Sequence, residues 1–227
     1  QVRFVNNLLE DLSRRDFTVN SMAFHPARGL IDPFGGRQDL ENRHIRCVGE
    51  ARARYEEDAL RILRALRFAS VLDFNLGEET AIQAKSCRKL LSFIAQERIY
   101  SEFIRMLCGQ GVGKILREFP EILSVFLPEF TATYGFCQHS PYHIYDVWEH
   151  TLKVVEGVSP QPALRLAALF HDAAKPKCFT LDNKFRGHFY GHPQRSAVLA
   201  RQALERLRVD EKTVREVCRL VETHEME

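Results

Sequence analysis

The sequence lacks several features that would assign it to a broad class at once. No apolar run approaches the about 18 residues that a transmembrane helix needs, and no signal or transit segment opens the chain. The six cysteines form no C-x-x-C pair, which argues against a disulfide framework in a chain of this size. A net charge of +2 is too small to indicate nucleic-acid binding by itself. We therefore expect a cytoplasmic globular protein with free thiols and no membrane partner.

An initiator methionine and internal repeats are also absent. The chain starts at Gln1 within an alternating stretch, Val2–Val5, so we expect it to be part of a longer protein. Its 227 residues are 45% apolar and 27% charged, which is ordinary for a globular protein. This length allows one or two compact domains with their own cores.

The hydrophobic pattern predicts a short β-containing segment followed by helices. Before residue 46 we expect a helix over about Asn7–Asp16 and a strand over Asn20–His25, separated from later elements by Pro- and Gly-containing turns. From Glu56 the apolar period becomes helical. Further helices are predicted over residues 78–92, 97–108, 111–118, 143–157, 161–174, 193–207 and 210–224.

Arginine is concentrated in one part of the chain. Seven arginines and four acidic residues stand between Arg43 and Arg67. The planar guanidinium fork suits phosphate recognition. A solvated helix face with ion pairs explains the same pattern equally well, so this stretch only suggests an anionic ligand.

Glu57, Asp58 and Arg61 form a second local pattern. Their spacing predicts that they rise from one side of a first helical turn. An Asp accepts hydrogen bonds and an Arg donates them in a fixed fork, so the two together resemble the edge of a base and could pair with an incoming nucleobase. Taken alone, the pattern is better explained by an i,i+4 ion pair of about 0.3–0.5 kcal/mol.

The order of several motifs makes the first half of the chain more specific. The motifs are Arg14–Asn20, Asp32–Gly36, Asp39-Leu40, Arg46–Gly49, Glu57–Arg61 and Glu97–Ile99. In this order and spacing, over about residues 8–105, they resemble the class II tRNA nucleotidyltransferase family, which comprises CCA-adding enzymes and bacterial poly(A) polymerases.

The resemblance implies roles for individual residues. The first motif would hold the triphosphate and sugar of a nucleotide, and Asp58 with Arg61 would form an amino-acid template that selects CTP and ATP. Glu97, Arg98 and Glu102 would form a neck motif that supports the helix carrying this template. The implied nucleotide-binding residues are Arg14, Arg15, Asp16, Asn20, Asp58, Arg61, Arg64 and Arg67, and the implied neck-support residues are Glu57, Glu97, Arg98 and Glu102.

One part of the family pattern is missing. The family's catalytic carboxylates lie in an Asp-x-Asp strand after a Gly-rich loop, where they hold the Mg²⁺ pair used in transfer. No such loop and strand precede Arg14. The resemblance therefore implies no catalytic residue for nucleotidyl transfer in this chain, and we expect the chain alone to be inactive in that reaction.

The last part of the chain contains a series of histidines with an acidic residue. Imidazole and carboxylate groups converging from separate helices are suitable metal ligands, although a single buried histidine is more often a satisfied core residue. The series is His150, His171, Asp172, Lys175, His188, His192 and His224. Over residues 143–225 it resembles the HD superfamily of metal-dependent phosphohydrolases.

That resemblance also implies individual roles. His150, His171 and Asp172 would bind a divalent ion, and His192 with His224 would bind a second ion or orient phosphate. Lys175 and His188 would lie on the phosphate side. Two departures, Glu225 in place of the usual closing Asp and Ala173-Ala174 after the HD pair, leave metal identity and activity open. The other histidines, His25, His44, His139 and His143, are assigned to surface or supporting positions.

We therefore expect a mostly α fold with three parts. Residues 1–46 would be a small β remnant of a nucleotidyltransferase palm, residues 47–138 a helical neck and body, and residues 139–227 an all-α HD domain. The expected function is part of a CCA-adding enzyme acting on the tRNA 3′ end. The alternatives are a poly(A) polymerase, a standalone HD phosphohydrolase whose front half binds RNA, and an RNA-binding module with both sites decayed. The sequence does not indicate an oligomeric state.

Overall fold

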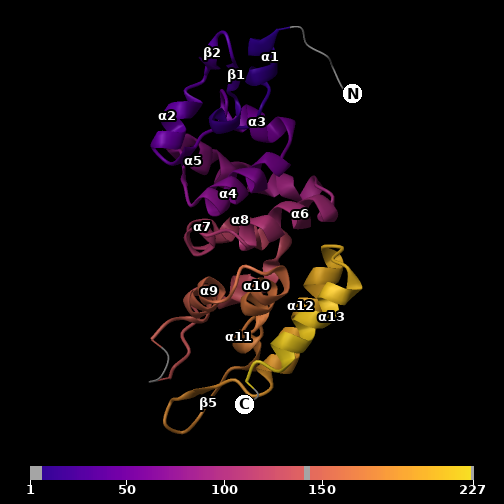
Figure 1. Cartoon of the computed structure of the whole chain (residues 1–227). Coiled ribbons are helices and arrows are strands. Elements are labelled where there is room, and N and C mark those ends of the chain that lie inside the picture. Colours follow the sequence, from indigo (N-terminus) through magenta and orange to yellow (C-terminus); the bar gives the residue numbers. More distant parts are fainter. Residues whose placement is uncertain (1–6, 141–143, 226–227) are drawn as a thin grey trace.

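The computed structural model describes residues 7–140 and 144–225, and it confirms a mainly helical fold with small sheets. This described part contains thirteen α-helices and three two-stranded sheets. The molecule is elongated, with α1–α3 at one end, α4–α8 in the middle and α9–α13 at the other end (Figure 1). The alternating stretch Val2–Val5 and His143 lie outside the described residues.

The N-terminal segment is smaller and less extended than predicted. The side chain of Asn7 caps the first helix by accepting from the Leu9 N–H. The predicted strand shrinks to three residues, in which Ala23 pairs with Ile31 in an antiparallel hairpin, because the preceding residues form a 3₁₀ turn. The elements are α1 (Leu8–Ser13), η1 (Thr18–Asn20), β1 (Ala23–His25), β2 (Gly29–Ile31) and α2 (Gly36–Glu41).

The helix predicted from Glu56 onward is interrupted. α3 (Ala51–Glu57) ends before Asp58, which has an extended backbone with φ −147°, and α4 (Leu60–Leu72) begins two residues later. The Asp58 carboxylate accepts the Leu60 N–H at 3.1 Å. Such a local side-chain bond competes with the helical ladder, as is common for Asp at helix starts. The expectation that Glu57, Asp58 and Arg61 share one helical turn was therefore wrong.

The middle of the chain packs helices on both sides of α4. Helix α6 packs along α4. The turn after α6 approaches α4 so closely that a Cβ added at Gly109 would lie 2.2 Å from Ser70 Oγ. The elements are β3 (His44–Ile45), β4 (Asn75–Leu76), α5 (Glu78–Cys87), η2 (Arg88–Phe93), α6 (Gln96–Leu107), α7 (Val112–Glu118), α8 (Pro120–Phe126) and η3 (Pro128–Thr133). The prediction for 97–108 and 111–118 is confirmed within one residue, whereas α8 was not predicted.

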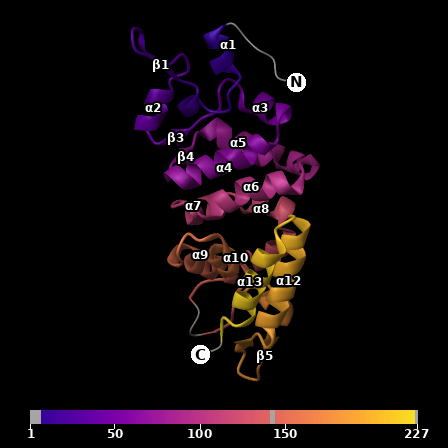
Figure 2. The same cartoon turned by 45° about the vertical axis from the view of Figure 1, so that its right-hand side comes forward.

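The last part contains the four predicted helices and three small elements that were missed. α10 stops at Phe170 because residues 171–174 form turns instead of continuing the helix. The elements are α9 (Val147–Gly157), α10 (Pro162–Phe170), α11 (Lys175–Cys178), β5 (Thr180–Leu181), β6 (Gly187–His188), α12 (His192–Arg206) and α13 (Glu211–Glu222). Helices α12 and α13 pack side by side along this end (Figure 2).

One apolar core runs through the whole described chain, from Phe17 to Val221. Polar contacts also join its middle and last parts: Arg117 on α7 lies 2.8 Å from Glu149 and 2.7 Å from Glu156, both on α9. All six cysteines are unpaired, and Cys137 is the exposed one. None of the described helices is long and apolar enough to cross a membrane. The predicted boundaries at residues 46 and 138 stay a prediction.

Candidate functional site

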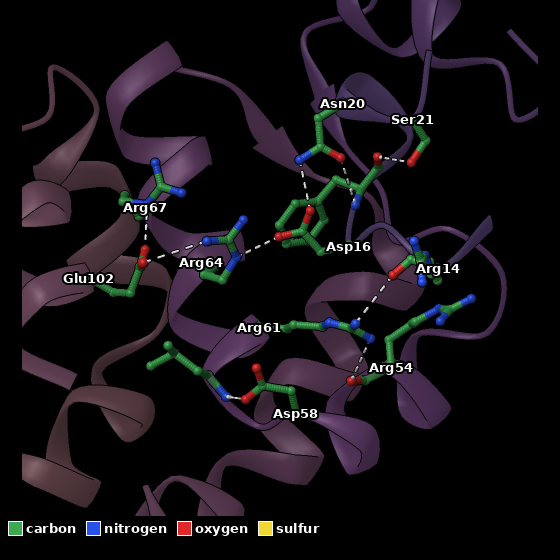
Figure 3. Close-up of polar contacts among 12 residues, drawn as sticks. Arg14, Asp16, Asn20, Ser21, Arg54, Asp58, Arg61, Arg64, Arg67 and Glu102 are labelled. Atoms are coloured by element: carbon green, nitrogen blue, oxygen red, sulfur yellow. Dashed lines mark hydrogen bonds and ion pairs between the residues drawn. The ribbon is translucent and has the colours of Figure 1, made fainter. Parts of the chain in front are cut away.

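The first candidate site lies where the N-terminal segment meets α4 (Figure 3). Arg64 Nε lies 2.5 Å from Asp16 Oδ2, and Asn20 Nδ2 donates to Asp16 Oδ1 at 2.7 Å. Burial of Asp16 opposes its ionisation, but the hydrogen bonds from Arg64 and Asn20 outweigh it and hold the pKa of Asp16 below its usual range. The motif predicted to bind a nucleotide is thus fixed to α4, which carries a row of three arginines, Arg61, Arg64 and Arg67.

A buried carboxylate organises the far end of that row. Glu102 on α6 is 6% exposed, and its oxygens lie 2.5 Å from Arg67 Nε and 3.7 Å from Arg64 Nη1. The Arg67 guanidinium also stands over the Phe68 ring, 4.1 Å from its centroid. Glu102 therefore contacts Arg64 and Arg67 of α4, and Arg67 is held between Glu102 and the Phe68 ring; the neck-support role of Glu102 stays a prediction.

The two template residues are held by different partners. Arg61 Nη1 lies 2.5 Å from Glu57 Oε2, and this hydrogen bond lowers the pKa of Glu57. Asp58 Oδ2 lies 3.3 Å from Arg98 Nη2 on α6. Asp58 and Arg61 thus offer an acceptor and a donor at the break between α3 and α4, each positioned by a predicted neck residue. This arrangement fits base recognition without the shared helical turn that the spacing predicted.

The remaining predicted residues of this site lie nearer the surface. Arg14 and Arg15 are exposed and pair with Asp11 at 2.7 and 3.2 Å, and Arg15 also donates to the Asn20 carbonyl at 2.9 Å. Glu97 is exposed, and within the described part of the chain its side chain makes no hydrogen bond or ion pair. The other three predicted neck residues, Glu57, Arg98 and Glu102, each form a side-chain ion pair.

Arg54 is a contributor that the sequence analysis did not select. Its guanidinium donates to the carbonyls of Ser13 at 2.6 Å and Val48 at 2.9 Å, so it ties α3 to the segment just before Arg14. The arginine-rich composition of this stretch was the available signal. It could not show which arginine faces backbone carbonyls.

The second candidate site gathers histidines from separate elements around Asp172. His150 comes from α9, and His171 with Asp172 follows the end of α10. Asp172 Oδ2 lies 3.1 Å from His171 Nε2 and 3.5 Å from His150 Nε2, and the two imidazole nitrogens are 3.3 Å apart. These separations suit three ligands of one ion, because metal–nitrogen bonds are about 2.0–2.1 Å for zinc.

The other oxygen of Asp172 faces a second pair of histidines. Asp172 Oδ1 lies 3.0 Å from His192 Nε2 and 3.9 Å from His224 Nε2. Both oxygens of Asp172 and the Nε2 of His192 are buried and make no hydrogen bond of good geometry in the described chain, although the Lys175 ammonium forms an ion pair with Oδ2. Buried polar atoms normally have partners, so this unmet demand fits divalent cations on both sides of Asp172.

Backbone carbonyls set the tautomer of three of these histidines. The Nδ1 atoms of His171, His192 and His224 lie 2.8, 2.9 and 2.7 Å from the carbonyl oxygens of Ala168, Phe189 and Val221. A carbonyl only accepts, so each Nδ1 carries the proton and each Nε2 directs its lone pair toward Asp172. Ligand histidines are commonly oriented in this way. The donor set and its orientation thus fit a metal centre.

The charge of Asp172 is compensated locally. Burial opposes its ionisation, but the positive charge beside it, including the Lys175 ammonium, lowers the pKa of Asp172 far below its usual range. Lys175 is itself buried, with Nζ 2.8 Å from Asp172 Oδ2 and donating to Gln138 Oε1 at 3.0 Å. Burial also lowers the pKa of His224. The imidazole of His224 is thus favoured in its neutral form, as a metal ligand must be.

Hollows open on both sides of this cluster. One, of about 360 Å³, is mostly apolar and is bordered by His150, His171 and His224. The other, of about 330 Å³, is lined by Lys175, Gly187, His188, Phe189, Tyr190, Gly191, His192 and Glu225. Lys175 and His188 therefore share one side of the cluster, and their role on the phosphate side stays a prediction. Glu225 is largely exposed, and its carboxylate lies 3.7 Å from His192 Nε2.

Fold and sites together define a mainly helical protein with an arginine-rich site near its N-terminal segment and a histidine cluster around a buried aspartate. Family models match a poly A polymerase head domain over residues 1–46, a probable RNA- and SrmB-binding site of polymerase A over 73–133, and an HD domain over 142–226. The chain thus shares a head domain and an RNA-binding segment with poly A polymerases, and it is similar to a tRNA nucleotidyltransferase. Its HD domain implies the use of a divalent metal.

Curated relatives and solved structures agree with this assignment. An A-adding tRNA nucleotidyltransferase of Deinococcus radiodurans is 36% identical over 96% of this chain and 52% of its own length. A CCA-adding enzyme of Enterococcus faecalis is 49% identical over 48% of this chain and 27% of its own. The structure of the Bacillus stearothermophilus CCA-adding enzyme with CTP matches 97% of this chain and 56% of its own, at 30% identity and TM-score 0.60. The chain thus spans about half, or less, of these relatives.

Proposed function

We propose that this chain is part of a tRNA nucleotidyltransferase that adds C and A from CTP and ATP to tRNA 3′ ends. The supporting observation is the pair of template side chains at the break between α3 and α4. Asp58 supplies the acceptor and Arg61 the donor, and Arg98 and Glu57 hold them. The match to a CCA-adding enzyme solved with CTP supports the same substrate class.

Addition of A alone is a second candidate. The relative that matches 96% of this chain, including its HD part, is named for A addition, whereas the Enterococcus CCA-adding enzyme matches 48% of it. An Asp–Arg pair provides hydrogen bonds to a base edge in both cases. The two activities would differ in whether CTP is accepted at all.

In transfer, this chain's own residues would bind and orient rather than carry the reaction. Arg14, Arg15, Asp16 and Asn20 would hold phosphate and sugar, and Arg64 would keep Asp16 in place. Mg²⁺, held by carboxylates in an Asp-x-Asp strand, would stabilise the attacking and leaving oxygens. The sequence has no Gly-rich loop with such a strand before Arg14, so this chain alone is expected to transfer nothing.

We further propose that the HD domain hydrolyses terminal or 2′,3′-cyclic phosphates with a divalent ion. His150, His171 and Asp172 would hold one ion, and Asp172, His192 and His224 a second. The ion would activate water for attack on phosphorus. Lys175 would bind a phosphate oxygen in the polar hollow beside the cluster, and His188 would line the same hollow. The unpaired thiols are consistent with work in the reducing cytoplasm.

The transfer proposal is tested with labelled CTP and ATP on tRNA ending before C, after the first C, or after both. The full-length protein and this chain are compared in Mg²⁺. Addition of C and A by the full-length protein alone supports the proposal. Addition of A only, on tRNA already ending in two C residues, favours the second candidate, and no incorporation by the full-length protein rejects both.

The hydrolysis proposal is tested by metal content and by release of phosphate from a 2′-phosphorylated RNA end. His171→Ala should lower bound divalent metal and abolish release, as should removal of metal by EDTA. His25→Ala, an exposed histidine of the N-terminal segment, is the matched control. Equal metal content in His171→Ala and the wild type would contradict the proposed ligands.

A further inference from the structure

A two-stranded hairpin borders the polar hollow of the HD domain. β5 and β6 pair antiparallel, with Thr180 opposite His188, and the chain then passes Tyr190 before α12 starts at His192. The proposed ligand His192 lies on the inner wall of the hollow, and Tyr190 belongs to the same lining. A molecule with its phosphate at Asp172 and His192 would therefore extend toward this hairpin.

Tyr190 is exposed, and its ring is held against a neighbouring ring. Its ring stacks on the His188 ring with centroids 5.3 Å apart and planes 5° from parallel, yet Tyr190 remains 78% exposed. Exposed aromatic rings that face a basic groove are the usual platforms for bases of single-stranded nucleic acids.

The stack is held in place by polar contacts. Tyr190 Oη lies 3.3 Å from His188 Nδ1, and His188 Nε2 lies 3.3 Å from Asp182 Oδ2. Asp182 in turn accepts from the Arg186 side chain at 3.0 Å and from two hairpin N–H groups. The orientation of the rings is therefore fixed before any ligand arrives, which lowers the entropy lost on binding.

Charge in the hollow favours a phosphate beside this platform. Lys175 is a buried cation on its inner wall, with Nζ near both Asp172 and the Phe189 ring. Among the residues that line the hollow, Glu225 is acidic, and its side chain is largely exposed to solvent. A ligand with an anionic end and a flat aromatic end would match the Lys175 side and the Tyr190 side of the hollow.

We propose that Tyr190, supported by His188, stacks on the nucleobase of the HD-domain substrate, so that the domain selects nucleoside phosphates over other phosphoesters. This inference rests on the proposed hydrolytic function. The substrate is either the end of an RNA strand or a free nucleotide, which share the base and the phosphate. Tyr190 is a specificity residue and takes no part in bond cleavage.

The experiment compares Tyr190→Ala with Phe185→Ala, which removes an equally exposed ring from the tip of the same hairpin. Hydrolysis of 2′,3′-cyclic AMP, of an RNA oligonucleotide with a cyclic phosphate end, and of glycerol 2-phosphate, which has no ring, is measured with Mn²⁺. Binding of adenosine 2′-monophosphate is measured by calorimetry in EDTA, with Arg61→Ala in every variant so that the template site does not contribute.

For Tyr190→Ala we expect a rise of about tenfold in KM for the nucleotide substrates with kcat little changed, because stacking of a base on an aromatic ring is typically this strong. Calorimetry should show a similar loss of affinity. Glycerol 2-phosphate turnover and all Phe185→Ala values should stay unchanged. A larger effect on the oligonucleotide than on cyclic AMP would identify an RNA end as the preferred source of the base.

Two results would overturn the platform: unchanged nucleotide affinity in Tyr190→Ala, or equal losses for nucleotides and glycerol 2-phosphate, which would indicate a structural role. Absence of hydrolysis in the wild type would reject the proposed hydrolytic function instead. The calorimetric comparison in EDTA would still decide whether Tyr190 contacts the base.

Discussion

Glu102 shows how a single buried acid can organise a basic surface. It is buried on α6 and holds Arg67 and, less closely, Arg64, and Arg64 in turn holds Asp16. The proposed nucleotide-binding motif is thus connected to the neck through a chain of charges rather than through apolar packing alone. Removing one member of such a chain leaves another charge buried without its partner.

Glu102→Gln should therefore destabilise the chain by about 3 kcal/mol, because it leaves the mostly buried Arg67 guanidinium without a counter-charge. Urea unfolding followed by circular dichroism measures the change. Glu97→Gln, on the same helix but exposed, is the matched control and should stay within about 0.5 kcal/mol of the wild type. Equal stabilities for the two variants would show that Arg67 finds solvent when Glu102 is neutral.

Asp16 should make stability depend on pH. Its pKa is lower in the folded chain than its ordinary 3.8, so the contribution is fully present above that value and is lost as the pH falls through the folded-state pKa. We expect the stability advantage of the wild type over Asp16→Asn to shrink as the pH is lowered below 3.8.

Thermal unfolding of the wild type and Asp16→Asn across acidic pH values measures this difference. The contributions of the other carboxylates to the pH dependence cancel, because both proteins contain them. A gap that stays constant with pH would mean that the ion pair with Arg64 contributes little. An advantage that grows toward acid would contradict the direction of the pKa shift.

At the scale of elements, the positions of most long helices could be predicted from the sequence, whereas the break between α3 and α4 could not. Apolar periodicity located most long helices, because their stripes are set by local sequence. The break at Asp58 was missed, since an acidic residue fits a helical start as well as an extended cap. The neck partner Arg98 was implied by family resemblance, and its contact with Asp58 depends on tertiary packing between α4 and α6.

The turn between α6 and α7 is another element set by close packing. Gly109 lies against Ser70 on α4, where an added Cβ would be 2.2 Å from Ser70 Oγ and 2.6 Å from its carbonyl carbon. Gly109→Ala should force the two helices apart and destabilise the chain by about 1–3 kcal/mol.

The matched control is Gly157→Ala, at the end of α9, where nothing lies within 4 Å of an added Cβ. This variant should be neutral or stabilised by up to about 1 kcal/mol, because Ala restricts the unfolded chain and favours helix. Chemical unfolding of both variants decides the matter. A Gly109→Ala protein as stable as the control would show that the turn can relax at no cost.

At the scale of the molecule, a single core joins parts that match separate family models. The apolar cluster passes from Phe17 to Val221, and Arg117 bridges α7 and α9. Motif order predicted the succession of parts, and the histidine series predicted which side chains meet around Asp172. Neither predicted that the core is continuous, because packing between parts leaves no short sequence motif.

We expect calorimetry to show one cooperative unfolding transition, with calorimetric and van't Hoff enthalpies in agreement. Separate unfolding of the parts would produce two transitions or a calorimetric enthalpy above the van't Hoff value. The thermogram of the intact chain, recorded without added metal, distinguishes these outcomes, because metal bound to one part would raise its transition selectively.

The distribution of the thiols makes the chain easy to observe. Cys137 is the exposed cysteine, Cys108 is half-buried with a pKa raised by burial, and the other four are buried. Cys137 immediately precedes Gln138, which holds Lys175 beside Asp172. A maleimide dye or nitroxide added at neutral pH should therefore react first at Cys137, and would report on RNA or metal arriving at the HD domain without any engineered cysteine.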